Sequence, residues 1–125
     1  MVERLPQWQR NMALTIERRT AGDVVVLDLK GRATIGRDAD FLNEALRREL
    51  SAGTRKLLAN LTDLVQVDSS GLANVVRTFV SMRRGGGEML LVVSPGRVRE
   101  VLEVTQLARA MTCYYDEASA LASFR

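Results

Sequence analysis

Two adjacent hydroxyl side chains, Ser69 and Ser70, are the groups in this chain best placed to take part in chemistry. Residues 65–72, VQVDSSGL, run from a strand-like alternation through these serines into an apolar helical pattern. Ser69 is therefore expected to be the N-cap of a helix. A phosphoryl group on it would meet free backbone N–H donors and the positive end of the helix dipole, beside the repelling carboxylate of Asp68. The site could therefore accommodate a modification, and the modification would change the charge at the start of the helix.

Other kinds of reactive site are excluded by composition. The chain has no histidine and one cysteine, Cys113, so Ser-His-Asp catalysis and a Cys/His zinc set cannot be assembled. The glycines at 85–87 precede a strand rather than a helix, and no Gly-Lys-Ser/Thr follows a strand, so no phosphate cradle is predicted. The acidic pairs at 38/40 and 116/117 fall at predicted helix starts, where the helix dipole explains them. We expect no enzymatic activity, no cofactor and no bound metal.

The helix that carries the serines is predicted from its apolar spacing. One face holds apolar residues at i, i+3, i+4, i+7 and i+8, and these are Leu72, Val75, Val76, Phe79 and Val80. The other face is predicted to be wet, and its residues are Asn74, Arg77, Thr78, Ser81, Arg83 and Arg84. Gly71, at the entry, would let another backbone or a ligand approach closely.

The remaining elements are predicted from periodicity and turn signals. A hairpin joins residues 14–18 to 24–29 through a turn at 21–23, and a helix capped by Asp38 or Asp40 follows a loop at 31–37 and ends at Gly53. Strands follow at 56–61, 89–93 and around 111–115, with helices starting at Ser94-Pro95 and at Asp116. The continuous apolar run at 57–59 indicates a strand buried on both faces. We predict an α/β fold, a mixed sheet of about four to five strands with helices mainly on one side.

Size and charge define the class of protein. A chain of 125 residues fits one domain, predicted at residues 13–125, and residues 1–12 are interpreted as an N-terminal extension. The net charge of +3 comes from dispersed arginines with few aromatics, which argues against nucleic-acid binding. No long apolar run or secretory signal is present, so we expect a cytoplasmic location without membrane insertion. Cys113 lies in an apolar run and is expected to be a small buried hydrophobe. The oligomeric state is not readable.

The segment DSSGL at residues 68–72, with LTDLV at 61–65 before it, resembles the signature of the STAS domain family, the anti-sigma factor antagonists of bacteria. The resemblance continues through GRAT at 31–34, GGEM at 86–89, SPGRV at 94–98 and LEVTQL at 102–107, and covers about residues 13–124. Two places differ. Many antagonists carry Gly-Glu-Leu-Asp or Gly-Glu-Ile-Asp where GRAT stands, so an acidic residue near the serines is missing, and the family usually has Gly where this chain has Ala73.

The resemblance implies a STAS-like mixed sheet and a phosphorylation switch. The hydroxyl after the aspartate, Ser69 here with Ser70 as the alternative, would be phosphorylated by a serine kinase that is itself the anti-sigma factor. The unphosphorylated antagonist would bind that kinase, and the phosphorylated form would release it until a phosphatase restores it. A phosphate adds about −1.5 to −2 charge, enough to disrupt a close interface.

The family brings the helix start and the 31–37 loop together, so we expect the partner-binding residues to be Asp68, Gly71, Asn74, Arg77, Thr34 and Gly36. An alternative of another class remains open. STAS domains also resemble the small subunit of lipid-transport ABC complexes, where the domain stabilises the ATPase without phosphorylation. A nucleotide-sensing role, suggested for some members, has no motif in this chain.

Overall fold

The structure, a computed structural model, describes residues 13–107 and 111–125. The elements in chain order are β1 (Leu14–Ala21), β2 (Val24–Ala33), α2 (Arg37–Ser51), β3 (Lys56–Val67), α3 (Ser69–Arg84), β4 (Glu88–Val92), α4 (Arg97–Val104), β5 (Cys113–Tyr114) and α6 (Glu117–Ser123). The predicted extension at residues 1–12 lies outside the described residues. Among the helices that are described, none combines the length and the apolar character needed to cross a membrane.

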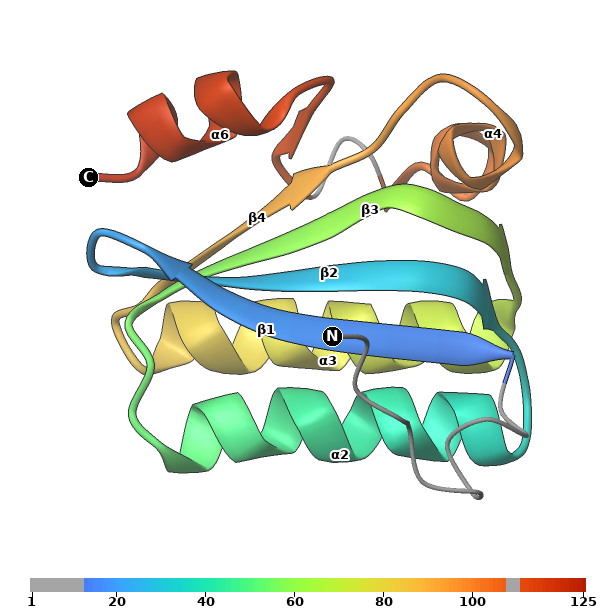
Figure 1. Ribbon diagram of the computed structural model, residues 1–125, viewed down its shortest axis with the longest axis horizontal. Helices are drawn as coiled ribbons and strands as arrows, with labels where there is room; N and C mark the ends of the chain where they lie inside the picture. Colours follow the sequence, from blue (N-terminus) through green and yellow to red (C-terminus); the bar gives the residue numbers. More distant parts are fainter. Residues whose placement is uncertain (1–12, 108–110) are drawn as a thin grey trace, which may run out of the picture.

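The strands form one mixed sheet in the order β1-β2-β3-β4-β5. β1 pairs antiparallel with β2, and the later neighbours pair in parallel, as crossover connections through helices require. Figure 1 shows the two long helices, α2 and α3, side by side on one face of the sheet, with the short α6 on the other side. The short α4 buries Val98 and Leu102 in the same cluster as residues of α2 and α3. The predicted fold class is confirmed.

The hairpin forms where it was predicted. Ala21 pairs with Val24 across a two-residue turn at 22–23, in which Gly22 adopts a φ of 62°. Both strands run further than expected: β1 continues to Ala21 and β2 continues to Ala33. The predicted 31–37 loop therefore shrinks to residues 34–36. Gly31 is required in this strand, since a Cβ there would lie 1.9 Å from the carbonyl oxygen of Ala13.

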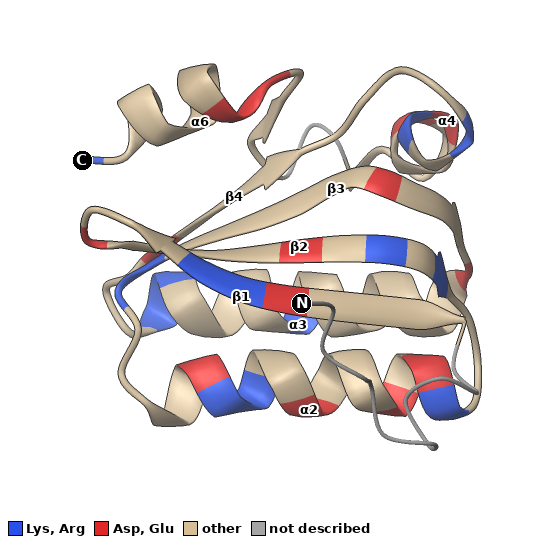
Figure 2. Ribbon diagram, in the orientation of Figure 1, with Lys and Arg blue, Asp and Glu red and all other residues tan. Residues whose placement is uncertain are grey.

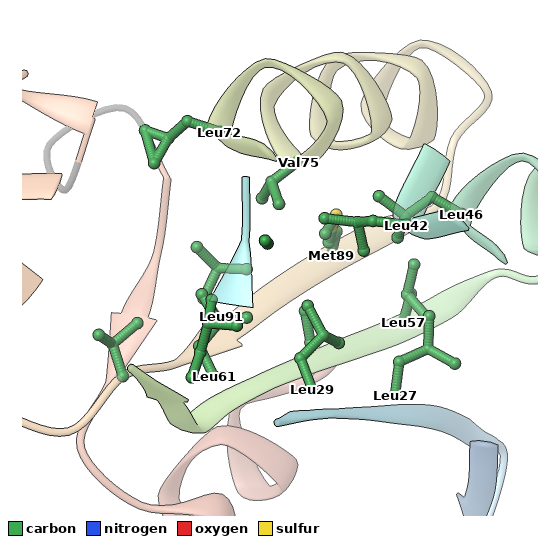
Figure 3. Close-up of a cluster of buried hydrophobic side chains, with 14 of the residues drawn as sticks. Leu27, Leu29, Leu42, Leu46, Leu57, Leu61, Leu72, Val75, Met89 and Leu91 are labelled. Carbon is green, nitrogen blue, oxygen red and sulfur yellow. The ribbon is translucent and has the colours of Figure 1, made fainter. Parts of the chain in front are cut away.

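The sheet is buried on both faces at its centre, as the apolar run at 57–59 predicted. Leu57 and Ala59 point into the larger cluster with α2 and α3, whereas Leu58 points into a smaller cluster with Ala120 of α6. Figure 3 shows the larger cluster, in which leucines of β2 and β3 meet Leu42 and Leu46 of α2 and residues of α3. This core fixes α2 and α3 against the sheet and against each other.

The predicted caps of α2 and α4 are wrong. Neither Asp38 nor Asp40 caps α2, which begins after Gly36 without a side-chain cap. The Asp38 carboxylate instead accepts from the backbone N–H groups of Ala13 and Leu14 at 3.1 and 3.2 Å, so tertiary contact outcompetes the local cap. Likewise, α4 begins at Arg97 after Gly96, three residues beyond the predicted cap at Ser94.

Candidate functional site

Asp68, and not Ser69, is the N-cap of α3, so the predicted cap is wrong by one residue. Asp68 has an extended backbone, and its Oδ1 accepts from the N–H groups of Ser70 at 3.0 Å and Gly71 at 3.1 Å. Its Oδ2 accepts from the N–H of Ile35 at 2.8 Å. One carboxylate therefore both caps α3 and holds the 34–36 loop against the start of that helix.

These backbone donors keep Asp68 ionised. Partial burial acts to raise the pKa of this carboxyl, but the N–H groups of Ile35, Gly71 and Ser70 act in the opposite direction, and the net result is a lowered pKa. A fixed negative charge is thus present beside Ser69 at neutral pH. A phosphate on Ser69 would find the Ser70 and Gly71 donors already occupied, which the sequence alone did not indicate.

Gly71 is needed because a strand passes directly against α3. A Cβ at this position would lie 2.3 Å from the carbonyl oxygen of Ala33 and 2.9 Å from a methyl group of Val67. The close approach expected at Gly71 is therefore made by the end of β2. Gly71 is buried, and its lack of a side chain lets the end of β2 lie against the start of α3.

Ser69 and Ser70 differ in their access to solvent. Ser69, the first residue of α3, is exposed, whereas Ser70 is half-buried. Ser69 also lies on a ridge between two hollows, because it borders both a polar hollow and an apolar one. A macromolecule that covers the Ser69 hydroxyl must therefore contact the rims of both.

The polar hollow lies between α2 and α3 and has a volume of about 370 Å³. It brings together several of the predicted contact residues with residues of α2, and its lining is Ile35, Gly36, Ala39, Asp40, Asn43, Ser69, Ser70, Ala73, Asn74 and Arg77. Thr34 does not line it. The Thr34 carbonyl instead accepts from the N–H of Ala39 at 3.0 Å and supports the start of α2.

Asn74 and Thr78 were predicted on the wet face of α3, and the structure contradicts this. Both are buried, because α2 packs against that side of α3. The Asn74 amide donates to the carbonyl of Ala39 at 2.8 Å, and its oxygen accepts from the guanidinium of Arg77. Asn74 thus joins the two helices and orients Arg77, which remains exposed at the rim. In contrast, Val80, predicted to be core, is 39% exposed.

Asp40 is a residue of this site that the sequence reasoning missed. It is exposed in the first turn of α2 and lines the polar hollow with Ser69. The GRAT segment lacks the acidic residue that many antagonists carry there. The hollow nevertheless contains a carboxylate, which α2 supplies. The helical spacing of Gly36, Asp40 and Asn43 is the signal that could have placed Asp40 on this face.

The apolar hollow lies between α3 and α4, on the other side of Ser69, and has a volume of about 430 Å³. Its lining is Asp68, Ser69, Leu72, Ala73, Val76, Arg77, Val101, Thr105 and Leu107. The sequence placed Val76 and Val101 on core faces, and both are in fact only half-buried against the larger cluster. Nothing in the periodicity distinguished a groove wall from core.

Carboxylates lie near Ser69, but the described residues form no cluster of metal ligands there. In the part of the chain that the structure describes, no three His, Cys, Asp or Glu side chains come close enough to hold a metal ion. Cys113 is half-buried against the larger cluster, and burial raises the pKa of its thiol. Figure 2 shows the basic residues of the last turn of α3 at the end of the helix away from Ser69.

Two comparisons with known proteins, by family model and by related sequence, point to the same family. The pattern of the STAS domain family matches residues 15–120. A candidate anti-sigma factor antagonist of Thermotoga neapolitana is 31% identical over 99 residues, which covers 79% of this chain and 88% of that protein.

Solved structures share the fold. An anti-sigma factor antagonist from Mycobacterium paratuberculosis superposes with a TM-score of 0.80 at 20% identity, covering 90% of this chain and 94% of its own. The phosphorylated form of SpoIIAA, a cell fate determinant of Bacillus, superposes with a TM-score of 0.65 at 20% identity, covering 88% and 97%. At these identities the structural likeness bears on the fold alone.

Proposed function

The chain belongs to the STAS domain family, and from that premise we propose that it is an anti-sigma factor antagonist switched by phosphorylation of Ser69. It docks on an anti-sigma serine kinase when Ser69 is unphosphorylated and releases the kinase when Ser69 is phosphorylated. A phosphatase restores the binding form. In this proposal the chain has no catalytic activity of its own, works in the cytoplasm and consists of the domain at residues 13–125 with an extension at 1–12.

The observation that carries the proposal is the exposed Ser69 hydroxyl at a rigidly held helix start. The Asp68 carboxylate and the close packing at Gly71 fix the backbone around it, so the serine is presented from a defined backbone position. A kinase can reach an exposed first-turn serine, whereas Ser70 is half-buried. The named antagonist relatives support the antagonist role, and the phosphorylated form of one fold neighbour, SpoIIAA, fits a switch by phosphorylation.

The charges around Ser69 explain why a phosphate would weaken docking. Asp68 and Asp40 already border the hollows, and Arg77 is the cation among the described residues that line them. Because this lining holds one cation beside two carboxylates, a new charge of about −1.5 to −2 is poorly compensated there. A partner surface fitted to the neutral serine would then have to desolvate an unpaired dianion.

The test is to incubate the chain with the anti-sigma kinase of its source organism and ATP, and to locate the phosphate by intact-mass and fragment spectrometry. We expect a single phosphate on Ser69, lost in Ser69→Ala and retained in Ser70→Ala. Phosphate on Ser70 alone would contradict the assignment. Calorimetry with the same kinase should then give tight binding for Ser69→Ala and binding weaker by about 1–3 kcal/mol for Ser69→Asp.

If Ser69→Asp and the phosphorylated chain both bind the kinase as tightly as the unmodified chain, the switch is wrong. A constitutive subunit, such as one that stabilises the ATPase of a lipid-transport ABC complex, would then take its place. A Ser69→Thr variant is the matched control, because it keeps the hydroxyl and should be phosphorylated.

A further inference from the structure

The apolar hollow between α3 and α4, called here the α3–α4 groove, is defined by Leu72, Val76, Val101, Thr105 and Leu107. We propose that this groove receives an apolar side chain of the anti-sigma kinase and is the anchor of the docking interface. The inference rests on the proposed function and adds to it the chemistry of the partner surface. That surface would carry an exposed aliphatic or aromatic residue beside the residues that approach Ser69.

The composition of the groove favours an apolar occupant. Its walls come from Val76 on α3 and from Val101 and Leu107 at α4 and beyond it, all half-buried against the larger cluster. Polar atoms contribute almost nothing to its exposed lining surface. A volume of about 430 Å³ falls within the roughly 300–1,000 Å³ range in which pockets hold substantial apolar groups. Covering these side chains would remove apolar surface from water, which is the main driving force for association.

The groove is continuous with the proposed phosphorylation surface. Ser69, Ala73 and Arg77 border both the α3–α4 groove and the polar hollow. A kinase that reaches the Ser69 hydroxyl therefore lies directly over the groove. An apolar anchor surrounded by a polar rim is the usual arrangement of the residues that dominate binding energy.

The position of Ser69 also argues for the kinase over other occupants. A second copy of this chain seated in the groove would cover Ser69, which the kinase must reach. The kinase, by contrast, can reach Ser69 and fill the groove with one surface, since Ser69 borders the groove.

This arrangement gives a physical route from phosphate to release. A phosphate on Ser69 stays hydrated, and its water shell lies at the rim of the α3–α4 groove. An apolar side chain of the kinase that enters the groove must displace water from this rim. Phosphorylation would thus act on the groove as well as by charge repulsion. The effects of Ser69→Asp and of a groove substitution on kinase binding should then be less than additive, because each removes part of the same contact.

The first test compares two valines one helical turn apart on α3. Val76 lines the groove, and Val80 is 39% exposed and lines neither hollow. Calorimetric titration of the full chain with the kinase should show binding about tenfold or more weaker for Val76→Asn, and within about twofold of wild type for Val80→Asn. Equal binding by both variants would overturn the proposal.

The second test avoids the half-buried position of Val76. Thr105 is exposed and lines the groove, whereas its neighbour Val104 is 82% exposed and does not. Thr105→Arg and Val104→Arg add the same charge to the end of α4 on accessible sites. We expect at least a tenfold loss of kinase binding for Thr105→Arg and less than a threefold loss for Val104→Arg. Thermal unfolding of each variant checks that the fold is kept.

The outcomes separate the groove from the switch. If Ser69→Asp weakens kinase binding while Val76→Asn and Thr105→Arg bind like their controls, the groove proposal fails and the switch stands. If the unmodified chain neither binds the kinase nor is phosphorylated by it, both fail. Light scattering of the chain alone is the remaining arm, and a dimer that Val76→Asn dissociates would assign the groove to a second copy and contradict the proposal.

Discussion

The two ends of α3 are built differently. The N-terminal end has an exposed hydroxyl on Ser69 beside the ionised cap Asp68, while the C-terminal end has Arg83 and Arg84 in its last turn. A helix of 16 residues is about 24 Å long, which exceeds the Debye length of roughly 8–10 Å at physiological salt. The arginines therefore complement the helix dipole at their own end and do little to neutralise a phosphate on Ser69. The charge of a modification is left to act on whatever is docked there.

Packing differs between the ends as well. A Cβ on Gly71 would lie 2.3 Å from the Ala33 carbonyl oxygen, whereas a Cβ on Gly85 has its nearest neighbour at 3.5 Å. The start of α3 is thus held by backbone contact with β2, whereas Gly85 at the end has room for a methyl group. The close packing at Gly71 fixes the backbone beside Ser69, and the comparison predicts that substitutions at the two ends have unequal effects.

The largest expected effect comes from glycine substitution. Gly71→Ala should lower the free energy of unfolding by about 2 kcal/mol or more, because the methyl group must displace the end of β2, even though Ala is the better helix former by ~1 kcal/mol. Gly85→Ala should change it by less than about 0.5 kcal/mol, since its methyl group meets only ordinary contacts. Urea denaturation of both variants measures the difference. Equal losses would remove the distinction between the tightly packed Gly71 and the roomier Gly85.

A smaller effect is expected from removal of the cap. Asp68→Ala should cost about 1–2 kcal/mol of unfolding free energy, because the N–H groups of Ser70, Gly71 and Ile35 lose their acceptor. Hydrogen exchange should show faster exchange at the Ile35 amide, which the carboxylate holds. Unchanged exchange at Ile35 would show that the loop is held by other contacts.

Asp68→Asn gives the matched control and a pH dependence. The folded-state pKa of Asp68 is lowered, so its stabilisation is fully present above the unfolded pKa of about 3.9 and is lost as the pH falls through the folded pKa. The stability advantage of wild type over Asp68→Asn should therefore be constant above about pH 5 and shrink below about pH 4. Denaturation at several pH values checks this prediction. A stability advantage of wild type that grew as the pH fell would contradict the lowered pKa of Asp68.

The smallest expected effect is at the C-terminal end of α3. Arg83→Gln should lower the free energy of unfolding by about 0.3–1 kcal/mol, through loss of its interaction with the helix dipole. The rate of Ser69 phosphorylation by the kinase should remain within about twofold of wild type, since the charge removed is distant. A kinetic assay at low salt makes the comparison most demanding, and a large change in rate there would mean that the two ends communicate.

The elements of the fold were predictable because their signals are local. The apolar spacing of α3, the two-residue turn at Gly22 and the buried run at Leu57 each appear within a short window of sequence. Their consequences, a hairpin followed by parallel strands and crossover helices, follow from general rules of chain connection. The position of the hydroxyls at the start of α3 was predictable for the same reason.

What the residue patterns could not indicate depends on which surfaces meet. Asn74 and Thr78 fall on a polar face by spacing, but α2 covers that face, and Asn74 becomes a buried link to Ala39. Asp38 has the spacing of a cap, yet it accepts from the backbone at residues 13 and 14. In each case a polar side chain found a partner distant in sequence, and the burial of that bond outweighed the local preference.

The sequence by itself determined the order of the elements, the core of the sheet and the place of Ser69 beside a carboxylate at a helix start. Only the tertiary structure decided that Asp68 binds the 34–36 loop, that Asp40 comes to the same hollow, and that an apolar groove opens beside Ser69. The physical reason is that periodicity reports which face of one element is apolar. Hollows, ridges and shared carboxylates arise where two or three elements meet, at distances along the chain that no local pattern spans.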